Sequence, residues 1–316
     1  MALIASLLVQ FGQMALVLLV APLLIGWIRK VKARLQRRRG PPLLQPYRDL
    51  YRLIGKEAVI AENASWLFRT APYLIFAFTW VGAALVPTFA TGLLFSWTGD
   101  LIVIISLLGA ARFLLALAGM DIGTSFGGIG ASREVMIASL AEPAMLMVVL
   151  TLALTAGSTQ LSTIADVMAS PVMGLRVSLA LALAAFLIVA IAENGRIPVD
   201  NPATHLELTM VHEAMVLEYS GRHLAMIELA ASLKLLLSLS AIACIFFPFG
   251  IAHGGGGSFA VGLASYVVKL GIAGVVLAVF ESAIAKMRVF RVPGLLGGAL
   301  MLGLLGTLLL YVARGM

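Results

Sequence analysis

Long apolar runs separated by short polar segments fill the chain, and eight of these runs are long enough to cross a membrane. A helix needs roughly 20 apolar residues to span the hydrocarbon core of a bilayer. The runs are longer than barrel strands and lack their two-residue alternation, so each is predicted to be a helix. They cover Ile4–Ile28, Leu67–Ala90, Leu101–Gly119, Val135–Ala156, Gly174–Ala192, Leu224–Phe249, Phe259–Ile284 and Val292–Val312. The pattern predicts an all-α, polytopic membrane helix bundle with about eight transmembrane helices.

The composition agrees with this class and leaves no room for a soluble domain. Hydrophobic residues make up 61% of the chain and only 12% of the residues are charged, and the mean hydropathy is +1.04. Such a chain must place most of its surface against lipid or other apolar helices. We therefore expect a single integral membrane domain over residues 1–316.

The distribution of Lys and Arg predicts the orientation of the helices. Eleven of the 22 basic residues lie between Arg29 and Arg69, whereas Pro87–Gly99, Gly157–Val172 and Gly250–Ser258 contain none. Because basic residues concentrate on the cytoplasmic side, the N-terminus is expected outside. A basic loop at residues 29–66 and an acidic loop at residues 193–223 are then cytoplasmic. Topology and anionic lipid headgroups explain the net charge of +7, so we predict no nucleic-acid partner.

Cysteine and glycine usage argues against a cofactor held by this chain. The single cysteine, Cys244, lies in an apolar run, and one thiol can neither form an internal disulfide nor hold an iron–sulfur cluster. The glycine-rich segment Gly123–Ser132 joins two predicted membrane helices without a preceding strand, so it is not a dinucleotide-binding fingerprint. We predict that this chain binds no cofactor of its own.

The basic loop contains a predicted interfacial helix. Leu50, Leu53 and Ile54 recur at helical spacing with basic residues on the other faces, as is typical of a helix lying in the headgroup plane. The loop is either an ordinary positive-inside anchor or a docking surface for a cytoplasmic partner, oriented by a stiff Gly-Pro-Pro corner at residues 40–42. The residues assigned to partner docking are Arg37, Arg38, Arg39, Gln45, Arg48, Asp49 and Arg196.

Seven ionisable residues fall within the apolar runs or at their ends. Acids and bases are both present, as expected if they pair inside the bundle rather than face lipid. They either tie helices together or form a polar track through the bundle, and we favour the track. They are Arg112, Glu134, Glu142, Glu228, Lys234, Lys269 and Glu281.

The acidic loop holds five of the 15 acids of the chain. Acids beside a bilayer are expensive and usually serve a function. Clustered carboxylates raise one another's pKa values by repulsion and desolvation, which suits proton relay near neutral pH. A helix through the loop would place Glu207 and Glu218 on one face, because eleven residues are close to three turns. The residues assigned to a proton path are Glu134, Glu142, Glu193, Asp200, Glu207, Glu213, Glu218, Lys234 and Lys269.

The same loop contains residue types that can bind a metal. His205, Glu207, His212 and Glu213 are ligand types for zinc, but their spacing is not H-E-x-x-H. His205 and Glu207 would also point in different directions on a helix. No metal site is predicted.

Several motifs together resemble a known family. The pattern E-x-G-R-x-P-x-D at Glu193–Asp200, followed by Glu-Tyr-Ser-Gly at residues 218–221, is similar to the subunit 1 family of respiratory complex I. The basic segment at residues 38–57 resembles that family's loop after the first helix, in the shortened form of membrane-bound hydrogenases. The Gly-Ala-Ser-Arg-Glu segment at residues 130–134 and Glu142-Pro143 fit the same group. The likeness is strongest for the membrane subunit of hydrogenase-4, formate hydrogenlyase and related group 4 nickel–iron hydrogenases.

This resemblance implies a non-redox membrane subunit that anchors a soluble electron-transfer arm and carries protons. It implies partners in a bacterial or archaeal cytoplasmic membrane. These are soluble hydrogenase-like large and small subunits, an iron–sulfur subunit and antiporter-like membrane subunits, with the nickel–iron centre and the iron–sulfur clusters held by those partners. The electron donor and the pumped ion are left open.

Two alternatives stay open. The chain could be the quinone-binding subunit 1 of an NADH:quinone oxidoreductase, or a stand-alone transporter, although no internal repeat is visible. Val199 stands where complex I forms usually have Phe, and Ala203 and His205 stand where they have acids. These differences weaken the case for a quinone headgroup site and also separate the chain somewhat from the formate hydrogenlyase pattern.

Overall fold

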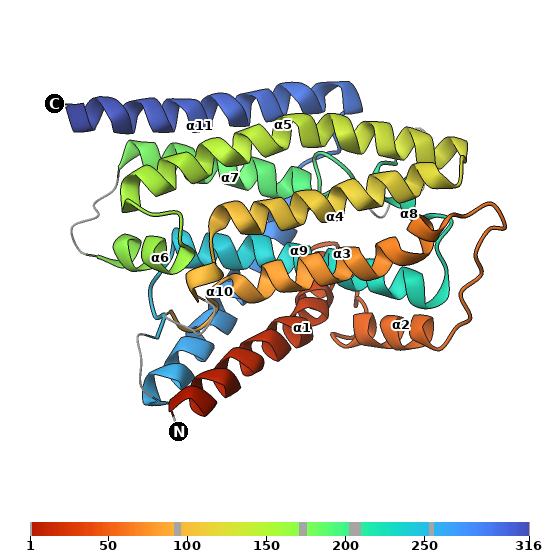
Figure 1. Ribbon diagram of the computed structural model, residues 1–316, viewed down its shortest axis with the longest axis horizontal. Coiled ribbons are helices and arrows are strands. Elements are labelled where there is room, and N and C mark those ends of the chain that lie inside the picture. Colours follow the sequence, from red (N-terminus) through yellow and green to blue (C-terminus); the bar gives the residue numbers. More distant parts are fainter. Residues whose placement is uncertain (1, 92–95, 171–175, 202–209, 253–255, 316) are drawn as a thin grey trace.

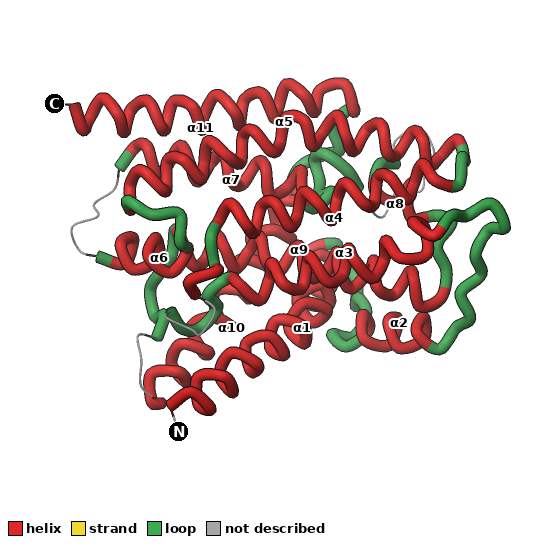
Figure 2. The backbone as a smooth tube through the Cα atoms, viewed as in Figure 1, coloured by secondary structure: helices red, strands yellow, loops and turns green. Residues whose placement is uncertain are grey.

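The computed structural model describes residues 2–91, 96–170, 176–201, 210–252 and 256–315, and these ranges are helical apart from loops and two isolated β-bridges. Figures 1 and 2 show the arrangement. The α-helices are α1 (Ala2–Leu35), α2 (Gln45–Ile54), α3 (Trp66–Leu85), α4 (Leu101–Asp121), α5 (Ser125–Ala156), α6 (Leu161–Ala169), α7 (Val177–Glu193), α8 (His212–Val216), α9 (Gly221–Ile245), α10 (Gly256–Ala283) and α11 (Val292–Gly315).

The membrane-bundle prediction is confirmed. Seven of the described helices are long and apolar enough to cross a membrane, and α7 is a shorter apolar helix of 17 residues. Both chain termini lie at the same end of the molecule (Figure 1), which requires an even number of crossings. We therefore count α7 as a crossing, which gives eight. We call the end with both termini and α6 the outer end, and the end with α2 and α8 the inner end.

Local signals set several helix starts. The Ser65 and Asp100 side chains accept hydrogen bonds from backbone N–H groups in the first turns of α3 and α4, as N-cap residues do. Thr124 does the same for α5, which begins ten residues before the predicted start at Val135. The glycine-rich segment expected to join two helices therefore forms the first turns of α5.

The helices pack in a continuous bundle around three groups of buried apolar residues. Helix α11 packs on α5 and α7, α3 packs on α4 and α9, and α1 packs on α9 and α10. The largest group lies between α1, α3, α4, α5, α6, α7, α9 and α10 and contains Leu152, Leu161, Leu233 and Leu236, all almost fully buried. In lipid these side chains stabilise the bundle through van der Waals packing rather than through transfer from water.

Backbone pairing closes the outer end. Ala252 N donates to Phe89 O at 2.9 Å, and Leu161 N donates to Gly99 O at 2.9 Å. Gln13 of α1 donates to the carbonyl oxygens of Ala84 and Val86, at 3.0 and 2.7 Å, where α3 ends. The outer loops are therefore tied to one another and to α1.

Candidate functional site

A cavity of about 430 Å³ occupies the inner half of the bundle. Its walls come from α1, α3, α4, α5, α8 and α9 and from the segment 192–201 that begins at the end of α7. Apolar side chains such as Ile25, Ile75 and Leu115 form part of the lining, but the wall is rich in charge. The charged lining residues are Arg29, Lys32, Arg112, Glu134, Glu193, Arg196, Asp200, Glu213, Glu228 and Lys234.

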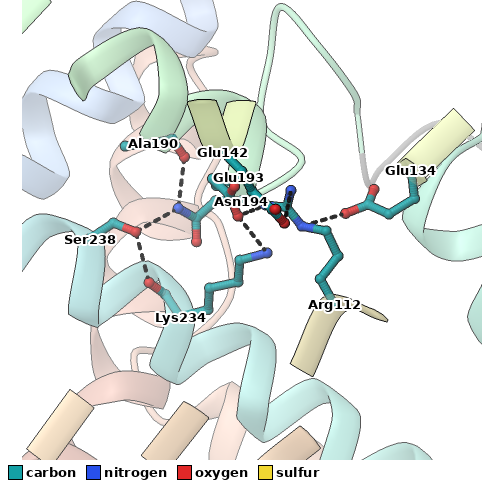
Figure 3. Close-up of polar contacts among 8 residues, drawn as sticks. All are labelled: Arg112, Glu134, Glu142, Ala190, Glu193, Asn194, Lys234 and Ser238. Carbon is teal, nitrogen blue, oxygen red and sulfur yellow. Dashed lines mark hydrogen bonds and ion pairs between the residues drawn. The ribbon is translucent and has the colours of Figure 1, made fainter. Parts of the chain in front are cut away.

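Arg112 is the centre of a cluster of three carboxylates. The residue lies on α4, and only 4% of its side chain is exposed. Its Nε lies 3.2 Å from Oε1 of Glu134 and its Nη1 lies 3.9 Å from Oε1 of Glu142, both on α5. Its Nη2 contacts Oε2 of Glu193 at the end of α7. Figure 3 shows these side chains converging on one guanidinium, so a single cation joins α4, α5 and α7.

Lys234 of α9 supplies the second cation of this cluster. Its Nζ lies 3.3 Å from Oε2 of Glu193, the same carboxylate that contacts Arg112. The neighbouring Asn194 donates through Nδ2 to Ala190 O at 2.7 Å and to Ser238 Oγ at 2.9 Å (Figure 3). Ser238 in turn donates to the Lys234 carbonyl at 3.0 Å. These bonds fix the end of α7 against α9. We call Arg112, Glu134, Glu142, Glu193 and Lys234 the Arg112 cluster.

The members of the Arg112 cluster differ in exposure. The side chains of Glu134, Glu193 and Lys234 are 12%, 15% and 20% exposed, whereas that of Glu142 is 44% exposed. A charge inside a bundle is retained at low cost only when it is paired or hydrated. Glu142 is therefore the cluster member that reaches the surface of the bundle, beside Gly109 of α4.

A second network lies nearer the inner end of the cavity. Glu281 of α10 is 2% exposed and pairs with Lys32 of α1 at 2.8 Å and with Arg196 at 3.5 Å. Asp200 pairs with Lys286 at 2.7 Å and also accepts hydrogen bonds from two backbone N–H groups. Burial lowers the pKa of Arg196, and the Glu281 carboxylate acts in the opposite direction. These pairs hold the segment after α7 against α1 and α10.

The Glu-Tyr-Ser-Gly motif connects this region to the basic loop. The ring of Tyr219 stacks on Phe68 with the ring centroids 3.9 Å apart, and its hydroxyl donates to Phe68 O at 3.1 Å. That carbonyl lies four residues before Pro72 of α3, and proline has no N–H to bond it. Tyr219 therefore replaces a hydrogen bond that Pro72 removes. Burial raises the pKa of the Tyr219 hydroxyl.

Ser220 and Gly221 complete this attachment. Ser220 Oγ accepts from Val59 N at 2.8 Å and donates to Val59 O at 2.9 Å. Gly221 has φ +53°, and a Cβ atom there would lie 2.6 Å from Glu57 O. Only glycine avoids both the strained backbone and this contact. The motif thus clamps the start of α9 onto residues 57–68.

The structure brings some of the predicted proton-path residues together and separates others. Glu134, Glu142, Glu193 and Lys234 meet at Arg112, as Figure 3 shows. Asp200 and Glu213 line the same cavity at its inner end. Glu218 is exposed in the turn after α8, and Lys269 is half-buried on α10 away from the cavity lining. Glu207 and His205 lie outside the described residues.

The predicted docking residues differ in exposure. Arg37, Arg38, Arg39 and Arg48 are exposed at the inner end, whereas Gln45 and Asp49 are half-buried and bonded to each other at 3.0 Å. The hydroxyl of Tyr47 donates to Leu19 O, which attaches α2 to α1. Arg196 is half-buried and pairs with Glu281.

The sequence placed Arg112 among the charges of a polar track but not in the proton path, and it did not identify Asn194 or Ser238. Arg112 is a lone cation in an apolar helix, and that isolation was the available signal. Asn194 and Ser238 carry no comparable signal, because single amides and hydroxyls are common in membrane helices. Among the residues that the structure describes, no three His, Cys, Asp or Glu side chains gather as metal ligands.

Fold and site together define a multi-span membrane protein with a charged cavity buried in its inner half. Residues 8–312 match a family described as NADH dehydrogenase, and the chain belongs to this family, as its motifs predicted. It is 35% identical over 289 residues to formate hydrogenlyase subunit 4 of Escherichia coli (strain K12), covering 91% of this chain and 93% of that protein. It is 36% identical over 246 residues to hydrogenase-4 component C of the same organism, covering 77% and 76%.

A solved structure shares the fold. The chain superimposes with a TM-score of 0.80 and 22% sequence identity on a chain of the membrane-bound sulfane sulfur reductase, an archaeal respiratory membrane complex. The match covers 97% of this chain and 99% of that chain. The fold of this helix bundle is therefore shared with a known membrane complex.

Proposed function

We propose that the chain is the non-redox membrane subunit of a nickel–iron hydrogenase complex of the hydrogenase-4 or formate hydrogenlyase type, in the cytoplasmic membrane of a bacterium or archaeon. It would anchor soluble large, small and iron–sulfur subunits, which hold the nickel–iron centre and the clusters. It would also carry protons toward antiporter-like membrane subunits. The Arg112 cluster at the deep end of an inner cavity is the observation that carries this proposal.

The charge balance of the Arg112 cluster suits proton carriage. Three carboxylates face two cations, Arg112 and Lys234, so the fully ionised cluster has a net charge of about −1. One bound proton makes it neutral. A change of charge in a docked redox subunit can shift that proton, because electrostatic interactions act over longer distances in a medium of low dielectric constant.

The cavity supplies a wet approach to this cluster. Arg112 Nε and Nη1, Glu193 Oε2 and Asn194 Oδ1 are buried without a well-aligned hydrogen-bond partner among the described residues. A polar cavity of about 430 Å³ is large enough for several water molecules that would satisfy these atoms. Water molecules and the carboxylates of Asp200 and Glu213 would then connect the inner end with Glu193.

The exit is proposed to be sideways through Glu142. Beyond Glu193 lies a cavity of only about 40 Å³, lined mainly by apolar residues such as Leu101, Ile104 and Phe186. Its polar lining residues are Glu142, Glu193 and Ser238, and the apolar remainder offers no hydrogen-bonded chain toward the outer end. Glu142 lines this cavity as well, and its side chain is 44% exposed, so an adjoining membrane subunit could receive the proton from it.

Purification of the complex from native membranes tests the anchoring role and distinguishes a hydrogenase subunit from a subunit of a quinone-reducing complex. The tagged chain, extracted in mild detergent, should bring soluble companions that contain nickel and evolve hydrogen with a reduced viologen. Companions that lack nickel but reduce quinone would overturn the hydrogenase assignment. Recovery of the chain alone would overturn the anchoring role itself.

A matched pair of variants tests the proton role. Glu193→Gln preserves shape but cannot lose a proton, so hydrogen turnover and proton movement in membrane vesicles should fall about 100-fold while the companions still co-purify. Glu62→Gln changes an exposed carboxylate of the inner loop and should leave both rates unchanged. Normal proton movement in Glu193→Gln would remove this residue from the path.

A further inference from the structure

Lys269 lies at a depth in the membrane where a charged side chain is energetically unfavourable. It is the fourteenth residue of the 28-residue helix α10, about 20 Å along the helix from its first residue. That position is near the middle of a membrane-spanning segment. Its side chain is half-buried at the edge of the exposed face of α10. A charged side chain at this depth normally pairs with an opposite charge inside the bundle.

No carboxylate of the described residues forms an ion pair with Lys269. The acids Asp100 and Asp166 lie at the start of α4 and on α6, and Asp100 accepts hydrogen bonds from Ile102 N and Thr159. The thiol of Cys244 on α9 is within electrostatic reach of Lys269, but a thiol is no substitute for a carboxylate. The described residues therefore supply no carboxylate partner for this cation.

Headgroup phosphates are too far away to serve. The middle of the hydrocarbon core lies about 15 Å from either headgroup region. Lysine can extend toward the interface only by the length of its flexible stem. A lipid phosphate therefore neutralises lysines near helix ends, and Lys269 lies at neither end of α10.

The face of α10 beside Lys269 has the pattern of a helix-packing surface. Val261, Val268, Ile272, Val275 and Val279 follow one another at spacings of seven, four, three and four residues, which places them on one side of the helix. They are 65%, 59%, 60%, 36% and 46% exposed. Only 22% of the apolar window of α10 is buried, the smallest share among the described spans. We call these five residues the α10 ridge.

We propose that the α10 ridge binds a transmembrane helix of another membrane subunit, and that a carboxylate of that helix pairs with Lys269. The spacing of the ridge matches the 3.5-residue repeat by which two helices interlock. Within the membrane, apolar packing alone distinguishes poorly between a helix and lipid, so the ion pair supplies the specificity. This inference rests on the part of the proposed function that places the chain among other membrane subunits, and not on proton carriage.

Photo-cross-linking in the intact complex tests the surface. A photoreactive amino acid replaces Val268 or Ile272, and a control position is Leu308 of α11, which is 52% exposed on another helix. We expect both ridge positions to cross-link to the same membrane subunit, in a helix that contains Asp or Glu. Adducts with lipid only, or with a second copy of this chain, would overturn the proposal.

Charge variants test the ion pair. Lys269→Met should reduce co-purification of the cross-linked subunit on the order of tenfold, as loss of one member of a buried charge pair does, whereas Lys269→Arg should retain it. Lys269→Glu combined with a lysine at the partner's acidic position should restore binding. Wild-type recovery with Lys269→Met, or no restoration by the exchange, would overturn the pairing. If no membrane companion co-purifies with the unaltered chain, the proposed function fails as well.

Discussion

The inner and outer halves of the bundle are built from the same apolar helices but are held together differently. In the inner half, Arg112 pairs with carboxylates of α5 and α7, and Glu281 pairs with cations of α1 and of the segment after α7. In the outer half, apolar side chains such as Leu161 and Ile245 fill the core, and backbone hydrogen bonds tie the loops.

This difference indicates which half of the bundle keeps charges for a reason other than cohesion. Apolar packing is sufficient to hold a membrane bundle, as the outer half shows, so the inner charges are not needed for cohesion alone. Buried ion pairs are weak sources of stability because desolvation offsets much of their attraction. Their concentration at one end, around a cavity, favours a functional reason for keeping them.

Among the variants that compare the two halves, removal of Arg112 should cause the largest loss of stability. Arg112→Gln leaves Glu134, Glu142 and Glu193 without their shared cation in a buried site, which should cost about 3–5 kcal/mol of stability. The measurement is thermal unfolding of the purified protein in detergent. Asp100→Ala is the outer control, because it removes the cap of α4 and the hydrogen bond from Thr159 but leaves no buried charge unpaired, and it should cost about 1–2 kcal/mol. Equal losses in the two variants would mean that the halves do not differ as argued.

The next largest difference in stability is expected for substitutions at two glycines, one at each end of the bundle. Gly221 at the inner end and Gly157 at the outer end both have positive φ, at +53° and +73°, but only Gly221 faces backbone within 4 Å. Gly157→Ala should cost about 1 kcal/mol from the left-handed backbone alone. Gly221→Ala adds a collision with Glu57 O and should cost more than about 2 kcal/mol. Similar melting temperatures for the two variants would contradict the clamp described for the Glu-Tyr-Ser-Gly motif.

The sequence was sufficient to predict the bundle because helix length and apolarity are local properties. Each predicted run overlaps a described helix, and only the boundaries differ. The early start of α5 was missed because glycines usually weaken a helix. Here Gly130 lies against Ala214 and Met215 of the α8 region, so the small residue is required by a close contact that no local pattern reveals.

The site could be predicted in composition but not in arrangement. Residue types identified Glu134, Glu142, Glu193 and Lys234, yet which charges meet depends on how helices far apart in sequence face one another. The face shared by Glu207 and Glu218 assumed one helix through the acidic loop. The described part of that loop contains a helix only at His212–Val216, and Glu218 is exposed after it. Helical periodicity predicts which residues share a face only within one continuous helix, and the chain leaves the helix after Val216.

The smallest difference in stability between the two halves is expected for two buried tyrosines. Tyr219 at the inner end bonds Phe68 O at 3.1 Å, and Tyr266 bonds the Ser240 hydroxyl at 2.8 Å. Tyr219→Phe keeps the ring stack but leaves a carbonyl that Pro72 cannot satisfy, so we expect a loss of about 1–2 kcal/mol. Tyr266→Phe should cost about 0.5 kcal/mol, because a helical serine can bond a carbonyl one turn earlier. The measurement is the thermal unfolding of both variants in the same detergent. A larger loss of stability for Tyr266→Phe would contradict the role of Tyr219 in attaching the start of α9 to Phe68.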